Sequence, residues 1–147
     1  MSEVPEEAAI EANATRFRVV QVADVVFDFA ATTAKLVLRE AEGTRREVTI
    51  PVALTDATTI FQAWKHELGR RPTNNELTGH ILEEVHADVI ATRIVKVVSG
   101  VYYAELDLMT PRGRRVFDAR PSDAIAIALR QTVQAPLLIA EDVLAQG

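Results

Sequence analysis

The sequence contains no cysteine, which excludes a disulfide scaffold, a cysteine-ligated zinc site and a thiol nucleophile. A chain without cysteine fits a reducing compartment, and we expect a cytoplasmic protein. No apolar run approaches the roughly 20 residues that a membrane span needs, so no membrane partner is expected. The first residues also lack the basic start and the apolar stretch of a secretory signal.

Several sequence motifs with a known chemical role are missing too. There is no phosphate-binding P-loop, no GxGxxG, no GxSxG and no HExxH. Nucleotide-driven, dehydrogenase and serine-hydrolase functions therefore have no motif support. A strongly basic balance is also absent, because the formal net charge is −5. A phosphate-bearing partner would have to be held by a local patch and not by the overall field.

The length of 147 residues and the hydrophobic content of 48% predict one globular domain. Residues 1–14 carry four glutamates and no basic residue, which predicts a disordered acidic tail. These glutamates account for most of the net charge, so the remaining chain is close to neutral. The domain is expected to cover residues 15–147.

Hydrophobic patterning predicts an α+β fold in the order β-β-β-α-α-β-β-β-α-β, with a mainly antiparallel sheet. The last strand is followed by a terminal turn or helix. In the strand after the Ser99–Gly100 turn, alternation places Tyr103, Glu105 and Asp107 on a solvated face. The predicted strands cover residues 17–29, 34–39, 47–52, 88–98, 101–109, 115–117 and 136–140.

Three helices follow from helical spacing and capping signals. The first has Thr55 or Asp56 as its cap, Gly69 at its end, and a stripe formed by Ala57, Ile60, Phe61, Trp64 and Leu68. The second begins with a Thr73–Glu76 capping box. Its predicted buried face consists of Leu77, Ile81, Leu82 and Val85. The third, residues 124–129, has no polar side, which predicts that it is buried.

The first candidate site is the polar turn that leads into this apolar helix. A helix start presents free N–H groups, and Ser122 is placed to cap it. The guanidinium of Arg120 offers paired N–H donors for a phosphate. Asp118 and Asp123 would bind a hard cation or activate water. An alternative explanation is structural. Asp123 would then complement the helix dipole, Arg120 would pair with Asp118 or Asp123, and Pro121 would fix the turn. Such a pairing would anchor a buried helix without any ligand.

Two weaker candidates involve basic residues and histidines. Arg112, Arg114 and Arg115 would contact a nucleic-acid backbone, although the same charges would also protect a sheet edge. Of the three histidines, His80 shares a helix face with Glu84, but such a pair is unspecific as a metal site.

Residues 118–130, DARPSDAIAIALR, closely resemble the D-x-RPSDAIALA-x-R signature of the bifunctional nuclease domain family. Further segments resemble the family at its strand before the first helix, its G-x-[FY]-[YF]-A strand and its closing strand: residues 50–52, 103–104 and 136–139. This resemblance implies a small α+β fold, a homodimer and hydrolysis of both DNA and RNA.

Together with the turn chemistry, this resemblance leads us to expect a divalent cation (Mg²⁺, Mn²⁺ or Ca²⁺) held by Asp118, Asp123 and Glu76, with Asp118, Arg120 and Asp123 as catalytic residues. Two departures from the family pattern support an alternative. Residues 54–59 lack the family's glycine and glutamate, and Asn75 replaces a histidine. Asparagine does not act as a general base. The alternative is a catalytically weak or inactive homodimeric binding or regulatory module of the same fold.

Overall fold

The computed structural model describes residues 16–146, so the predicted tail over residues 1–14 lies outside the described residues. The α+β class and the element order are confirmed, and the predicted terminal turn is the short helix α5. The strands are β1 (Phe17–Asp28), β2 (Thr33–Glu40), β3 (Glu47–Val52), β4 (Asp88–Val98), β5 (Val101–Thr110), β6 (Gly113–Ala119) and β7 (Leu137–Ala140). The helices are α2 (Leu54–Trp64), α3 (Asn74–Glu84), α4 (Pro121–Leu129) and α5 (Glu141–Gln146).

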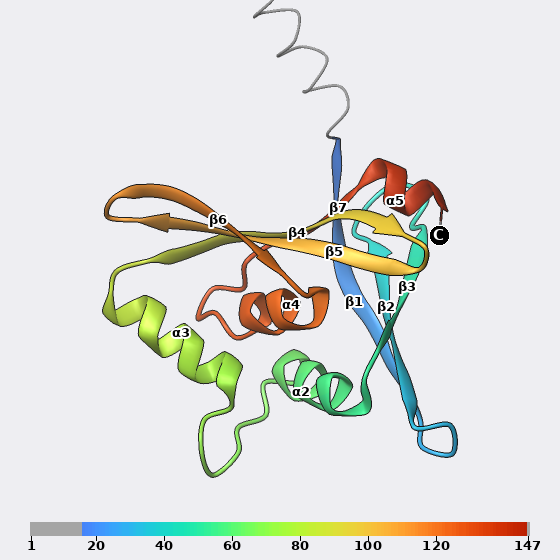
Figure 1. Ribbon diagram of the computed structural model, residues 1–147, viewed down its shortest axis with the longest axis horizontal. Coiled ribbons are helices and arrows are strands. Elements are labelled where there is room, and N and C mark those ends of the chain that lie inside the picture. The colour runs from blue at the N-terminus through green and yellow to red at the C-terminus, as the bar shows by residue number, and fades with distance from the viewer. Residues whose placement is uncertain (1–15, 147) are drawn as a thin grey trace, which may run out of the picture.

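The strands form a seven-stranded sheet in the order β3-β2-β1-β7-β4-β5-β6. Two antiparallel meanders, β1–β3 and β4–β6, are joined by β7, which pairs antiparallel with β1 and parallel with β4. The meanders cross at a steep angle in Figure 1, as the right-handed twist of a sheet requires. β3 and β6 are therefore the two edges of the sheet.

Helices α2, α3 and α4 lie on one side of the sheet, whereas α5 lies beside β7 (Figure 1). Residues 124–129 of α4 are all buried, at 0–8% exposed, which confirms the prediction for an all-apolar helix. The Thr92 hydroxyl on β4 donates to the Ala124 carbonyl at 2.8 Å and ties the sheet to the helix. In the described part of the chain, no helix is long and apolar enough to cross a membrane.

Helix α2 differs from its prediction at both ends. It begins after Ala53, which is an N-cap without a side-chain hydrogen bond, so neither Thr55 nor Asp56 caps it. It ends at Trp64 because the backbone reverses at His66, which has a φ of 56°. Leu68 therefore lies outside the helix and is 79% exposed, and its predicted place in the buried stripe is wrong.

Helix α3 confirms its predicted cap but not its predicted buried face. The Thr73 hydroxyl accepts a hydrogen bond from the Glu76 backbone N–H at 3.3 Å. However, the side of α3 that packs inward carries Asn75, which is 8% exposed. The rotation of the helix about its axis leaves most of the apolar stripe in solvent, at 50–54% exposed: Leu77, Ile81 and Val85.

Candidate functional site

The polar turn that precedes α4 has a different arrangement from the one predicted. The helix begins at Pro121, with Arg120 as its N-cap residue, and no side chain caps it. Proline suits the first helical position because it has no N–H to satisfy. Ser122 is therefore not the cap; it lies inside the first turn and is 8% exposed. The start of α4 retains backbone N–H groups without a capping side chain.

Arg120 joins the starts of two helices. Its Nε lies 2.9 Å from an Asp123 carboxylate oxygen, and its Nη1 lies 3.2 Å from an oxygen of Asp56, in the first turn of α2. The hydrogen bond that Arg120 donates to Asp123, supported by the charges of both aspartates, raises the pKa of Arg120. The Arg120–Asp123 pair is one of the two pairings that the structural explanation predicts, and the Arg120 side chain within it is 63% exposed.

A cavity of about 370 Å³ lies beside this cluster. Its lining brings together the end of β3, the starts of α2 and α4, and the β4–β5 turn. Neither α2 nor α4 has a side-chain cap, and each helix start carries a partial positive charge. Two such helix starts and Arg120 supply positive charge at this cavity, whereas Asp56, which also lines it, and Asp123 supply negative charge.

Sequence reasoning missed the contribution of Asp56 to this site. The sequence presents Asp56 only as a candidate helix cap, whereas the structure makes it an ion-pair partner of Arg120, 64 positions away. The local sequence around Asp56 contains no signal for this pairing, because it depends on how α2 and α4 pack together.

The other residues expected at this site lie elsewhere. Asp118 is on β6, opposite Glu105 of β5, and neither pairs with Arg120 nor lines the cavity. Glu76 lies 3.5 Å from Arg130, at the far end of α4. Arg130 follows Asp123 by seven positions along α4, a rise of about 10 Å.

The predicted metal set of Asp118, Asp123 and Glu76 is consequently not assembled. Within residues 16–146, no three His, Cys, Asp or Glu side chains form a group suited to a metal ion. This also leaves the pair of His80 and Glu84 without a third ligand in that part of the chain. Among the described residues, the side chains do not form a group that fits a bound divalent cation.

A second charged cluster lies on the face of β4–β6 that points away from α4, which we call the open face. Asp107 was expected to be solvated there, but its side chain is 2% exposed. It accepts hydrogen bonds from Arg93 at 2.7 Å and from Arg114 at 2.7 and 2.9 Å. The hydrogen bond from Arg114 is the largest influence that lowers the pKa of Asp107. The two arginines therefore cover the carboxylate of Asp107, which alternation along the strand predicts to face solvent.

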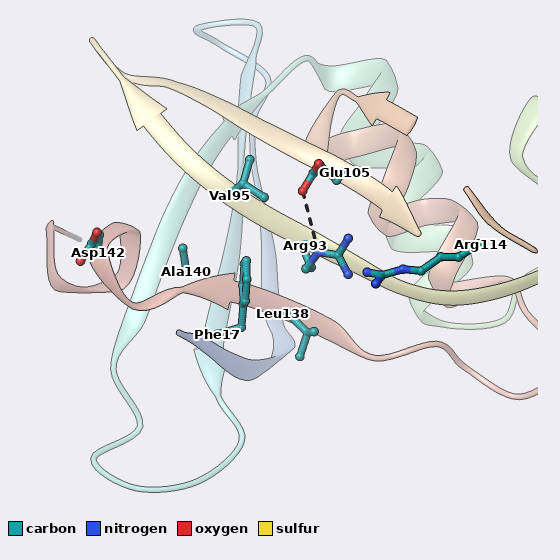
Figure 2. Close-up of a pocket in the computed structure, with 8 residues that line it drawn as sticks. All are labelled: Phe17, Arg93, Val95, Glu105, Arg114, Leu138, Ala140 and Asp142. Carbon is teal, nitrogen blue, oxygen red and sulfur yellow. Dashed lines mark ion pairs between the residues drawn. The ribbon is translucent and has the colours of Figure 1, made fainter. Parts of the chain in front are cut away.

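Figure 2 shows the guanidinium groups of Arg93 and Arg114 side by side at a cavity of about 550 Å³. Glu105 lies 3.8 Å from Arg93 across the same cavity. Of the three arginines predicted to bind nucleic acid, Arg114 is thus engaged with Asp107. Arg115 donates to a backbone carbonyl at 2.9 Å, and Arg112 is exposed at the β5–β6 turn.

Comparison with known proteins identifies the chain's family. The model of the bifunctional nuclease domain matches residues 36–147. The chain belongs to the bifunctional nuclease domain family. It is also similar to the uncharacterized proteins MT1877 and Rv1829, from two strains of Mycobacterium tuberculosis, at 36% identity over 112 residues in each case. These alignments cover 76% of this chain and 65% of each relative, so the match spans about two-thirds of the relatives' length.

The bifunctional nuclease domain match contains every segment that lines the cavity beside Arg120. It begins within β2, so β1 lies outside it. In this chain β1 nevertheless pairs with both β2 and β7 in the middle of the sheet. The resemblance noted from residues 118–130 is confirmed at the level of the family.

Proposed function

We propose that this bifunctional nuclease domain protein hydrolyses phosphodiester bonds of DNA and RNA at the cavity beside Arg120. One observation carries the proposal. Three segments at or next to those that resemble the family, although far apart in the chain, line this one cavity: residues 50–52, 100–102 and 120–122. A shared cavity is what a common substrate site requires.

Arg120 and the two uncapped helix starts supply the attraction for a phosphate group. The guanidinium of Arg120 is already bonded to Asp56 and Asp123, and these three side chains carry a combined formal charge of −1. A phosphate that binds Arg120 must therefore displace one carboxylate. The displaced carboxylate then lies next to the phosphate, where it accepts a proton from an attacking water as the water oxygen bonds to phosphorus. The P–O bond to the leaving sugar oxygen breaks in the same step, and that oxygen takes up a proton from solvent.

A second function is a catalytically weak or inactive module that binds nucleic acid without cutting it. The guanidinium of Arg120 is already bonded to two carboxylates, which favours this function. The absence of a metal-suited group among residues 16–146 favours it too. Asn75 adds to it, since the histidine of the family pattern is missing from α3. The two functions share the phosphate-binding cavity and differ only in the chemical step.

The test compares binding and cleavage of labelled single-stranded DNA and RNA, with EDTA and with added Mg²⁺, Mn²⁺ or Ca²⁺. We expect Arg120→Ala to lose both binding and cleavage. We expect Asp56→Asn to bind the oligonucleotide more tightly, because it removes one of the two carboxylates bonded to the Arg120 guanidinium. Arg39→Ala is a matched control, since Arg39 pairs with Glu47 and is 48% exposed.

Binding without cleavage under every metal condition would select the inactive module. Wild-type and Arg120→Ala proteins that bind oligonucleotides equally well would remove the cavity from both functions.

A further inference from the structure

The cavity of Figure 2 lies on the open face of β4–β6 and extends over β7 and β1. With a volume of about 550 Å³, it is larger than the cavity beside Arg120 and has the size of a site for a small organic molecule. Its floor is apolar and includes Phe17, Val95 and Leu138. Charged side chains of both signs border this floor, and the proposed hydrolysis uses none of them.

The register of the strands brings a charge pair and an apolar group together at Arg93. This residue of β4 lies directly opposite Glu105 on β5 and opposite Leu138 on β7. Its Cζ atom lies 5.9 Å from the centre of the Phe17 ring. Neighbouring strands are only about 4.8 Å apart, so one small molecule at Arg93 also contacts its neighbours. Such a molecule meets an arginine, a carboxylate and an apolar surface at once.

Both arginines at this cavity keep an N–H group that the described residues do not use. Arg93 donates to Asp107 through Nη1, and Arg114 does so through Nε and Nη2. Within residues 16–146, the Nη2 of Arg93 and the Nη1 of Arg114 have no partner, although no side-chain nitrogen there is buried without one. The unused Nη2 of Arg93 is therefore accessible. Two neighbouring guanidinium donors suit the two oxygens of a carboxylate.

Two carboxylates beside these donors also lack a hydrogen-bond partner among the described residues. Glu105 lies 3.8 Å from the Nε of Arg93, which is beyond hydrogen-bond distance. Its neighbour across the β5–β6 pair is Asp118, so two like charges lie side by side, which is destabilising. The other acidic residue of the lining, Asp142, lies apart from both arginines in Figure 2. A positively charged group such as ammonium relieves the repulsion between Glu105 and Asp118.

We propose that the open-face cavity binds an α-amino acid with a large apolar side chain. The carboxylate of this ligand bonds to Arg93 and Arg114, its ammonium group lies at Glu105, and its side chain covers Phe17 and Leu138. The two charged groups of an α-amino acid share one carbon atom, which matches the short distance between Arg93 and Glu105. An anion alone lies against Glu105, and a cation alone lies against the arginines, so like charges oppose both. The zwitterion satisfies both signs, and burial of its apolar side chain adds to the affinity.

Titration of the full chain with amino acids, followed by the NMR chemical shifts of the backbone amides, tests this site. It uses no nucleic acid, so its outcome is independent of the proposed hydrolysis. We expect saturable binding of leucine and phenylalanine. N-acetylleucine keeps only the negative charge and leucinamide only the positive one, so each should bind about ten- to a hundredfold more weakly than leucine. Glycine has no apolar side chain and should bind at least about tenfold more weakly.

Variants of the charged residues separate their roles in the site. Glu105→Gln should bind leucine and N-acetylleucine about equally, because the ammonium group has lost its partner. Asp118→Asn, at an exposed position, should shift this preference in the same direction by a smaller factor. Arg114→Ala should reduce the preference for leucine over leucinamide about tenfold. Glu47→Gln and Arg39→Ala, which break an exposed ion pair between β2 and β3, are the matched controls and should keep both preferences.

Three outcomes would overturn the proposal: no binding of leucine or phenylalanine up to their solubility, N-acetylleucine or leucinamide bound as tightly as leucine, or a full preference for leucine in Glu105→Gln and Asp118→Asn. Shift changes confined to the start of α4 would also overturn it, since they place the amino acid at the cavity beside Arg120. Circular dichroism shows that each variant is folded. Binding of N-acetylleucine by Glu105→Gln, and of leucinamide by Arg114→Ala, shows that the rest of the site is intact.

Discussion

Arg93 and Arg120 both pair with aspartates, but they differ in burial, and we expect removal of Arg93 to cost far more stability. The Arg93 side chain is 12% exposed and bonds to the buried Asp107. Arg93→Ala leaves Asp107 with one arginine, and a hydrogen bond to a charged group contributes about 1.5–3 kcal/mol. We therefore expect a loss of about 2–3 kcal/mol in the free energy of unfolding, or roughly 5–10 °C in Tm for a chain of this size.

Arg120→Ala should cost less than about 1 kcal/mol, because ion pairs in contact with solvent contribute little. The losses in unfolding free energy of both variants are measured by urea unfolding. Unfolding is followed by circular dichroism and by the fluorescence of Trp64, the single tryptophan. Arg39→Ala controls for removal of an exposed arginine. If Arg120→Ala destabilises the fold as much as Arg93→Ala, the ion pairs of the turn are a structural anchor after all, and this reasoning from exposure is wrong.

Three further predictions concern the carboxylate of the open face, a helix cap and the core. The pKa of Asp107 is lowered mainly by its hydrogen bond from Arg114, so its contribution is present above the ordinary value of 3.8 and lost as the pH falls below it. The difference in unfolding free energy between wild type and Asp107→Asn should accordingly shrink in urea titrations below that pH. Thr73→Ala should cost about 1 kcal/mol in urea unfolding, because it removes the cap of α3; an unchanged midpoint contradicts this. Ile125→Ala should cost about 2–5 kcal/mol, seen as a lower Tm, because Ile125 is 0% exposed in α4; a loss below 1 kcal/mol would show that the core closes around the missing atoms.

The strands and the buried helix follow from patterns that are local in sequence. Alternation and short turns predict the hairpins of β1–β3 and β4–β6, and an apolar run without a polar side predicts the burial of α4. The position of β7 between β1 and β4 is not local, because it joins segments more than 40 positions apart. Hairpin signals identify neighbours within each meander but do not indicate which strands join the two.

The errors in the predicted site have the same origin. Periodicity shows that Leu77 and Ile81 lie on one side of α3, but not which side faces the protein, and the packed side proves to carry Asn75. Alternation places Asp107 away from the core, but not beneath two arginines that come from other strands. Each depends on contacts between elements, about which the sequence of one element contains no information.

The signature of residues 118–130 divides into three parts once it is placed in the fold. Residues 124–129 belong to the core, and Arg120 with Asp123 lies at the cavity where we propose that phosphate binds. Asp118 belongs to neither, because it lies on the sheet edge opposite Glu105 and lacks an ion pair among residues 16–146. A catalytic role does not explain that position. Oligonucleotide cleavage should therefore depend on Arg120 and not on Asp118, although the two residues lie only two positions apart.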